Sequence, residues 1–148
     1  MITRKSSAIW EGSLRDGRGH MKVGRGAYEG PYSFASRFEQ GPGTNPEELL
    51  GAAHAGCFSM AFAGMLARAG TPPKRIQTEA EVGLEKVGDG FRITTVNLTT
   101  EAEVPGIEEK DFQELAEKAK AGCPVSQALA GTAITLRARK TGGGGELV

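Results

Sequence analysis

The sequence has very little cysteine, no excess of charge of either sign and no apolar run at its amino terminus. It holds two cysteines, Cys57 and Cys123, among 148 residues. Because there is no Cys-x-x-Cys pair, neither a zinc ribbon nor a thioredoxin-type motif is predicted. Residues 1–12 do not resemble a signal peptide or a membrane span, so we expect a cytoplasmic protein. In that compartment a structural disulfide is not expected, because thiols are kept reduced.

The balance of charge also excludes several partners. Lysine plus arginine and aspartate plus glutamate each number 18, which gives a formal net charge of zero. A nucleic-acid binder needs a basic face and an anionic membrane attracts a polybasic cluster, so we expect neither nucleic acid nor membrane as a partner. The most apolar stretch, Leu49 to Ala69, is interrupted by His54 and three glycines. It is predicted to be a buried helix rather than a bilayer-crossing one.

Caps mark that helix clearly. Asn45 is a preferred N-cap, Pro46 suits the first helical position, and Glu47 places negative charge at the positive end of the helix dipole. The helix is predicted to end near Arg68, before Gly70. Since it carries hardly any charge between these ends, it is apolar on every face and must be covered on every face. We therefore expect a second subunit to contribute cover.

Elsewhere the patterns are shorter. We predict strands over residues 7–10, 20–23, 32–38, 76–84, 91–104 and 135–138, a helix over 108–121, and a short helical turn after Cys123. A shift of the apolar phase between Ile93 and Val96 indicates a β-bulge. The prediction is one α+β domain over residues 1–140, followed by a disordered glycine-rich tail over 141–148.

The surroundings of the two cysteines differ. Cys57 lies inside the apolar helix, three residues after His54, where most cysteines pack as small hydrophobic residues. Cys123 precedes Pro124 and would be the N-cap of a new helix, where free amides stabilise a thiolate. It could be a reactive thiol or merely a cap.

Two long motifs carry a family resemblance: GTNPEELLGAAHAGCFSM at residues 43–60 and AKAGCPVS at residues 119–126. Together with residues 9–12, 32–39 and 104–107, they make the chain similar to the OsmC (osmotically inducible protein C) branch of the OsmC/organic hydroperoxide resistance family. The resemblance spans nearly the whole chain. It implies an OsmC-like α+β fold with an antiparallel sheet, a long buried central helix and an intertwined homodimer.

The same resemblance implies a peroxidase without metal or haem that takes part in oxidative and osmotic stress defence. Cys57 would be the peroxidatic cysteine and Cys123 the resolving one, with Arg37 and Glu47 activating the thiolate. The substrates would be organic hydroperoxides and also hydrogen peroxide. An external dithiol, a lipoyl-bearing protein, would then reduce the Cys57–Cys123 disulfide. An apolar pocket with lining residues such as Phe34, Phe58 and Met60 would suit organic substrates.

Helix geometry adds a constraint on these assignments. Glu47 and Cys57 are ten residues apart on one helix, which corresponds to about 15 Å along the axis and about 80° around it. A Glu47 of the same chain therefore cannot easily serve Cys57. Two antiparallel copies of the helix could bring Glu47 of one chain near Cys57 of the other, which again predicts an obligate homodimer with two sites at its interface.

Several alternatives remain at this point. Glu47 could only cap its helix, and a different arginine could take the place of Arg37. His54 is interpreted as a buried, hydrogen-bonded residue rather than a catalyst, and a Cys–His hydrolase lacks an orienting acid. A zinc site could use His20, His54, Cys57 and Cys123, although it would lack the usual short ligand pairs. A ligand-binding protein without activity could also share the fold. The other arginines considered are Arg15, Arg18 and Arg25.

Overall fold

A computed structural model describes residues 1–142 of the chain. The strands are β1 (Ser7–Glu11), β2 (Arg18–Val23), β3 (Tyr28–Tyr32), β4 (Arg75–Val87), β5 (Gly90–Glu103) and β6 (Ala133–Thr141). The helices are α1 (Phe34–Phe38), α2 (Pro46–Arg68), α3 (Glu109–Gly122) and α4 (Pro124–Ala128). Apart from Thr141, which ends β6, and Gly142, the predicted tail lies outside the described residues.

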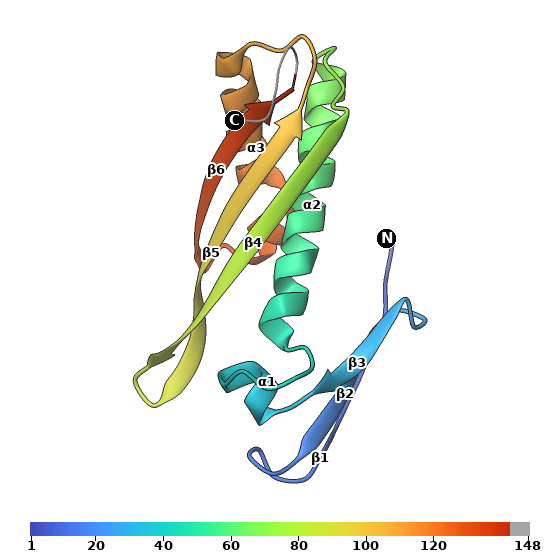
Figure 1. Ribbon diagram of the computed structural model, residues 1–148, viewed down its shortest axis with the longest axis vertical. Helices are drawn as coiled ribbons and strands as arrows, with labels where there is room; N and C mark the ends of the chain where they lie inside the picture. Colours follow the sequence, from blue (N-terminus) through green and yellow to red (C-terminus); the bar gives the residue numbers. More distant parts are fainter. Residues whose placement is uncertain (143–148) are drawn as a thin grey trace. The chain divides into compact units, whose positions relative to one another are not determined.

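The chain divides into two compact units, residues Met1–Leu49 and the described residues from Leu50 onward (Figure 1). Each unit has its own three-stranded sheet, β1–β2–β3 in the first and β4–β5–β6 in the second. The single domain over residues 1–140 stays a prediction. Together the sheets and helices make the predicted α+β class.

The first sheet is antiparallel throughout and is organised around Gly19. Gly19 in β2 pairs with Trp10 in β1 and with Tyr32 in β3. The two aromatic rings lie 5.4 Å apart between centroids. A Cβ atom on residue 19 would collide with both rings, so only glycine lets them close over the middle strand.

The strand predicted over residues 32–38 is wrong beyond Tyr32. The chain turns there into α1, which Ser33 begins by accepting the backbone N–H of Ser36 at 3.0 Å, while the Ser36 hydroxyl accepts the N–H of Ser33 at 2.8 Å. This reciprocal pair is a capping box. Phe34 and Phe38 then stack one turn apart, with centroids 4.9 Å apart. Over seven residues, an apolar spacing of four fits a helix as well as an alternating strand.

Helix α2 begins and ends where its caps predict. The Asn45 side-chain oxygen accepts the backbone N–H of Glu48 at 2.8 Å, which satisfies one of the free amides of the first turn. The Glu48 carboxylate in turn accepts the hydroxyl of Thr44 at 3.0 Å. After Arg68 the chain leaves the helix, and Gly70 adopts a φ of +89° that glycine reaches without a steric penalty.

The second sheet is mixed, not purely antiparallel as predicted. β4 and β5 form an antiparallel hairpin, but β6 runs parallel to β5. The reason is the connection, since α3 and α4 cross over the sheet between β5 and β6 and return the chain to the same end. The predicted β-bulge is confirmed, because the register shifts where Gly83 pairs with Thr95 and Leu84 pairs with Ile93.

Packing between α2, α3 and the sheet makes the core of the second unit. Figure 1 shows both helices behind β4, β5 and β6. Phe62 is fully buried, and its ring lies 5.6 Å from that of Phe58 on the same helix and 5.4 Å from that of Phe112 on α3. On the β4 side, the Ser59 hydroxyl lies 2.8 Å from that of Thr78. Buried aromatic rings in such contacts dominate the apolar area removed from water.

The opposite face of α2 is not covered by any of residues 1–142. Met60 is 79% exposed, and the neighbouring positions on this face, Ala52, Ala53 and Gly56, are also exposed. By length and composition α2 could cross a membrane. However, its inward residues Phe58 and Phe62 belong to the hydrophobic core, so α2 is a core helix with one open apolar face.

Candidate active site

The two cysteines come together in the second unit as free thiols. Cys57 lies on α2, and Cys123 lies at the break between α3 and α4, where its extended backbone (φ −65°, ψ 142°) ends one helix and begins the next. The backbone N–H of Val125, in the first turn of α4, points to the sulfur of Cys57 at 3.5 Å. The fold therefore brings together two thiols that are 66 residues apart in sequence.

Cys123 is the N-cap of α4, as predicted. Its sulfur accepts the backbone N–H of Ser126 at 3.4 Å, and Pro124 occupies the first helical position. The thiol also donates to the Ser126 hydroxyl at 3.2 Å. Cys123 is 1% exposed, so this sulfur exchanges hydrogen bonds with Ser126 rather than with bulk water.

His54 completes this cluster, although sequence reasoning had given Ser126 no role. The Nε2 atom of His54 lies 2.7 Å from the Ser126 hydroxyl, and the residue has no exposed surface. The predicted buried, hydrogen-bonded histidine is confirmed. Its Nδ1 atom is buried and has no hydrogen-bond partner among the residues that the structure describes. Burial lowers the pKa of His54, because a charged imidazolium loses its hydration there.

Within one chain, Cys57 is held as a thiol. Burial raises its pKa, and the neighbouring Cys123 raises it further, while the Val125 N–H works in the opposite direction by stabilising the thiolate. Only a thiolate is an effective nucleophile toward a peroxide. A cation placed close to Cys57 would therefore have to supply the missing stabilisation of the charged form.

The predicted activating pair is assembled in the first unit. Arg37 stands in the last turn of α1 and Glu47 in the first turn of α2. The guanidinium donates two hydrogen bonds to the carboxylate, from Nε to Oε1 at 3.0 Å and from Nη2 to Oε2 at 2.8 Å. Such a bidentate pair fixes the orientation of the guanidinium plane. Glu47 is 8% exposed, whereas the side chain of Arg37 is 35% exposed.

The other arginines have different surroundings. Arg15 lies over the Phe34 ring at 4.5 Å from the centroid, and Arg18 forms an exposed ion pair with Glu11 at 3.6 Å. Arg25 lines a separate cavity, described below. Of the four arginines considered, only Arg37 is shown with a bidentate, largely buried carboxylate.

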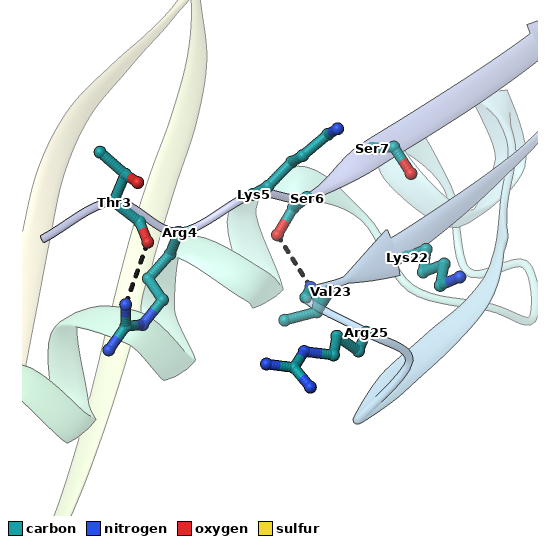
Figure 2. Close-up of a pocket in the computed structure, with 9 residues that line it drawn as sticks. Thr3, Arg4, Lys5, Ser6, Ser7, Lys22, Val23 and Arg25 are labelled. Atoms are coloured by element: carbon teal, nitrogen blue, oxygen red, sulfur yellow. Dashed lines mark hydrogen bonds between the residues drawn. The ribbon is translucent and has the colours of Figure 1, made fainter.

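The described residues of the first unit form a larger and a smaller cavity. The larger, about 930 Å³, is bordered by the chain before β1 and by the turn after β2, where the Ser6 hydroxyl accepts the N–H of Gly24 at 3.1 Å (Figure 2). None of the predicted site residues lines it. The smaller cavity, about 290 Å³, does contain Arg37. Its other lining residues are Trp10, Leu14, Tyr32, Ser33 and Phe34.

The predicted apolar lining is only partly brought together. Phe34 does line the smaller cavity, beside Arg37. Phe58 is fully buried in the core, and Met60 lies on the open face of α2. The zinc alternative finds no ligand set, since among residues 1–142 no three histidine, cysteine or acidic side chains are placed to hold a metal ion. His20 instead lies 3.0 Å from the carboxylate of Glu29.

The sequence is similar to those of known proteins. The family model described as OsmC-like protein matches residues 39–138. Peroxiredoxin OsmC of Escherichia coli K12 is 51% identical over 129 residues, which cover 86% of this chain and 90% of that protein. An organic hydroperoxide resistance protein of Xanthomonas axonopodis pv. citri (strain 306) is 34% identical over 92 residues, 62% of this chain and 63% of that protein.

Solved structures agree on the fold. An organic hydroperoxide resistance protein from Elizabethkingia anophelis superimposes with a TM-score of 0.73 at 25% identity, covering 95% of this chain and 99% of that one. The organic hydroperoxide resistance protein OhrB of Bacillus subtilis gives a TM-score of 0.69 at 24% identity, covering 93% and 98%.

Proposed function

Because this chain belongs to the OsmC-like protein family and is a thiol-based hydroperoxide peroxidase, we propose that Cys57 is its peroxidatic cysteine and Cys123 its resolving cysteine. The observation that carries the proposal is that the two free cysteines lie close together in the fold. Val125, two residues after Cys123, donates its N–H to the sulfur of Cys57 at 3.5 Å.

The chemistry follows in two steps. The Cys57 thiolate attacks one oxygen of the hydroperoxide, the O–O bond breaks, and the alkoxide leaves and takes a proton to become an alcohol. Cys57 is thereby oxidised to a sulfenic acid. The Cys123 sulfur then attacks the Cys57 sulfur, a disulfide forms, and the S–O bond breaks to release water. An external dithiol restores both thiols by exchange.

Arg37 and Glu47 activate the Cys57 thiolate in this proposal. The support is their bidentate pairing together with the burial that raises the pKa of Cys57, since a guanidinium remains protonated when partly buried. Glu47 and Cys57 both stand on α2, ten residues apart, which corresponds to about 15 Å along a helix. The pair therefore serves Cys57 of a second copy of the chain.

A homodimer formed through α2 supplies that second copy. The open apolar face of α2 around Met60, Gly56 and Ala52 is the surface that such a dimer would cover. In sedimentation at micromolar concentration we expect a dimer for the native protein and a monomer for Met60→Asp. A monomeric native protein would contradict the proposal.

The substrates we propose are organic hydroperoxides, with hydrogen peroxide as a further substrate. The aromatic cavity formed by Trp10, Tyr32 and Phe34 beside Arg37 would receive an apolar substituent. A lipoyl-bearing protein is proposed as the dithiol reductant, and the protein is proposed to act in the cytoplasm in oxidative and osmotic stress defence.

The test is turnover of cumene hydroperoxide and hydrogen peroxide with dihydrolipoamide as reductant. Cys57→Ser should lose activity, because no sulfenic acid can form. Cys123→Ser should lose turnover yet still form a sulfenic acid at Cys57, which a dimedone adduct detects. If the native protein consumed neither peroxide with any dithiol, the chain would instead be a ligand-binding protein on the same fold.

A further inference from the structure

Three buried side chains form a continuous hydrogen-bonded chain that ends on the sulfur of Cys123. The thiol lies 3.2 Å from the Ser126 hydroxyl, and that hydroxyl lies 2.7 Å from Nε2 of His54. All three residues are buried, with exposed fractions of 4% or less. A buried hydroxyl between a thiol and an imidazole can accept a proton from one side and donate one to the other.

We infer that Ser126 and His54 form a proton relay that converts the Cys123 thiol into a thiolate for its attack on the Cys57 sulfenic acid. Ser126 is the catalytic residue, because its hydroxyl touches the reacting sulfur. His54 acts through Ser126 and is a positioning residue. The inference rests on the proposed roles of Cys57 and Cys123.

The relay balances without any further reactant. Cys123 gives its proton to the Ser126 oxygen while Ser126 gives its own proton to Nε2 of His54. The thiolate attacks the Cys57 sulfur, the S–S bond forms and the S–O bond breaks. The hydroxide that leaves takes up one proton and departs as water, and His54 gives up the proton that it received from Cys123 through Ser126. One thiol and one sulfenic acid therefore yield one disulfide and one water, with no net proton.

The surroundings of His54 suit a transient acceptor. Its burial favours the neutral imidazole, which is the form able to accept a proton, and none of the described residues forms a hydrogen bond with its Nδ1 atom. The titratable groups that face it are Cys123 through Ser126 on α4 and Cys57 on the next turn of α2. The buried β5 residues of the same core, Val96, Leu98 and Thr100, carry no charge.

The test separates the relay from a purely structural role by pH dependence. Reduced protein is mixed with cumene hydroperoxide, quenched at millisecond times, and analysed by mass spectrometry for sulfenic acid and disulfide. In the native protein the rate of disulfide formation should change little from about pH 6.5 to about pH 8, because neutral His54 is present throughout. In Ser126→Ala the thiol must lose its proton to water, so the rate should fall at least tenfold at pH 7 and rise about tenfold per pH unit.

Controls keep the outcomes distinct. Ser59→Ala removes a similar hydroxyl contact from α2, to Thr78, and should leave the rate of disulfide formation and its pH dependence unchanged. His54→Gln should behave like Ser126→Ala, and Ser126→Ala carries the test if His54→Gln does not fold. The same pH dependence in the native protein and in Ser126→Ala would overturn the relay. A native protein that forms sulfenic acid but no disulfide would instead overturn the roles of the two cysteines.

Discussion

Replacing Arg37 should destabilise the protein more than replacing its partner Glu47, although both changes break the same ion pair. The difference comes from burial, since Glu47 is 8% exposed and the Arg37 side chain is 35% exposed. In Arg37→Gln a carboxylate stays buried without its cation. In Glu47→Gln the guanidinium turns toward water, and the new amide oxygen still accepts a hydrogen bond.

The expected loss in the free energy of unfolding follows from how far each side chain is buried. Removing one partner of a fully buried ion pair costs about 3–5 kcal/mol. Water reaches Arg37 and screens this pair, so we expect a loss of about 2 kcal/mol for Arg37→Gln. For Glu47→Gln we expect a loss of about 1 kcal/mol, the net value of a typical hydrogen bond, because the amide oxygen keeps the other one. The difference of about 1 kcal/mol is roughly a fivefold difference in the unfolding equilibrium constant.

Urea unfolding at pH 7 and fixed protein concentration measures both losses. Trp10 is the only tryptophan and lies in the same unit as the ion pair, so its fluorescence follows the relevant part of the chain. Arg18→Gln is the matched control, because its pair with Glu11 is largely exposed and contributes little. If Arg37→Gln were no less stable than Glu47→Gln, the argument from the buried carboxylate would be refuted.

Three further changes test other parts of the structure. Phe62→Ala should lower the free energy of unfolding by about 4 kcal/mol, because it empties a fully buried ring site, and urea titration measures this. Gly19→Ala should separate the rings of Trp10 and Tyr32, which a red shift of tryptophan emission would report. The native protein should lose stability as pH falls below about 6.5, because the unfolded chain then protonates its histidine while the buried His54, whose pKa is lower, does not. His54→Gln should remove this loss. Midpoints of urea unfolding, measured as a function of pH, would show both effects.

Each of these expectations has a clear contrary result. A loss under about 1 kcal/mol for Phe62→Ala would mean that the core collapses around the missing ring. Unchanged emission in Gly19→Ala would mean that the middle strand can move away from the rings. If the urea midpoint fell equally with decreasing pH in the native protein and in His54→Gln, groups other than His54 would control stability at low pH.

Elements with strong local signals could be predicted from the sequence. The caps at Asn45 and Gly70 fixed both ends of α2 because capping chemistry acts within a few residues. The bulge opposite Gly83 was predictable because alternation along β5 changes phase there. α1 was missed because a helix of five residues leaves no periodicity that differs from an alternating strand.

The orientation of β6 and the partner of His54 depend on the whole fold. Whether β6 runs parallel to β5 depends on how α3 and α4 cross the sheet, which no pattern within β6 records. Ser126 looks like an ordinary hydroxyl residue in a short helix, and its partner His54 is 72 positions away. The choice of Arg37 and Glu47 followed only from the family resemblance, because arginines are common in this part of the chain, and their ion pair is seen only in the structure.

The parallel pairing of β5 with β6 has a consequence for the order in which the protein assembles. β4 and β5 are joined by a tight turn and can pair as soon as both are made, whereas β6 pairs with residues 38 positions earlier in the chain, such as Thr135 with Asn97. Cys123 lies in the crossover between these strands. The crossover that carries it is anchored at both ends only once β6 pairs with β5, so we expect β6 to be made before the two thiols are held together.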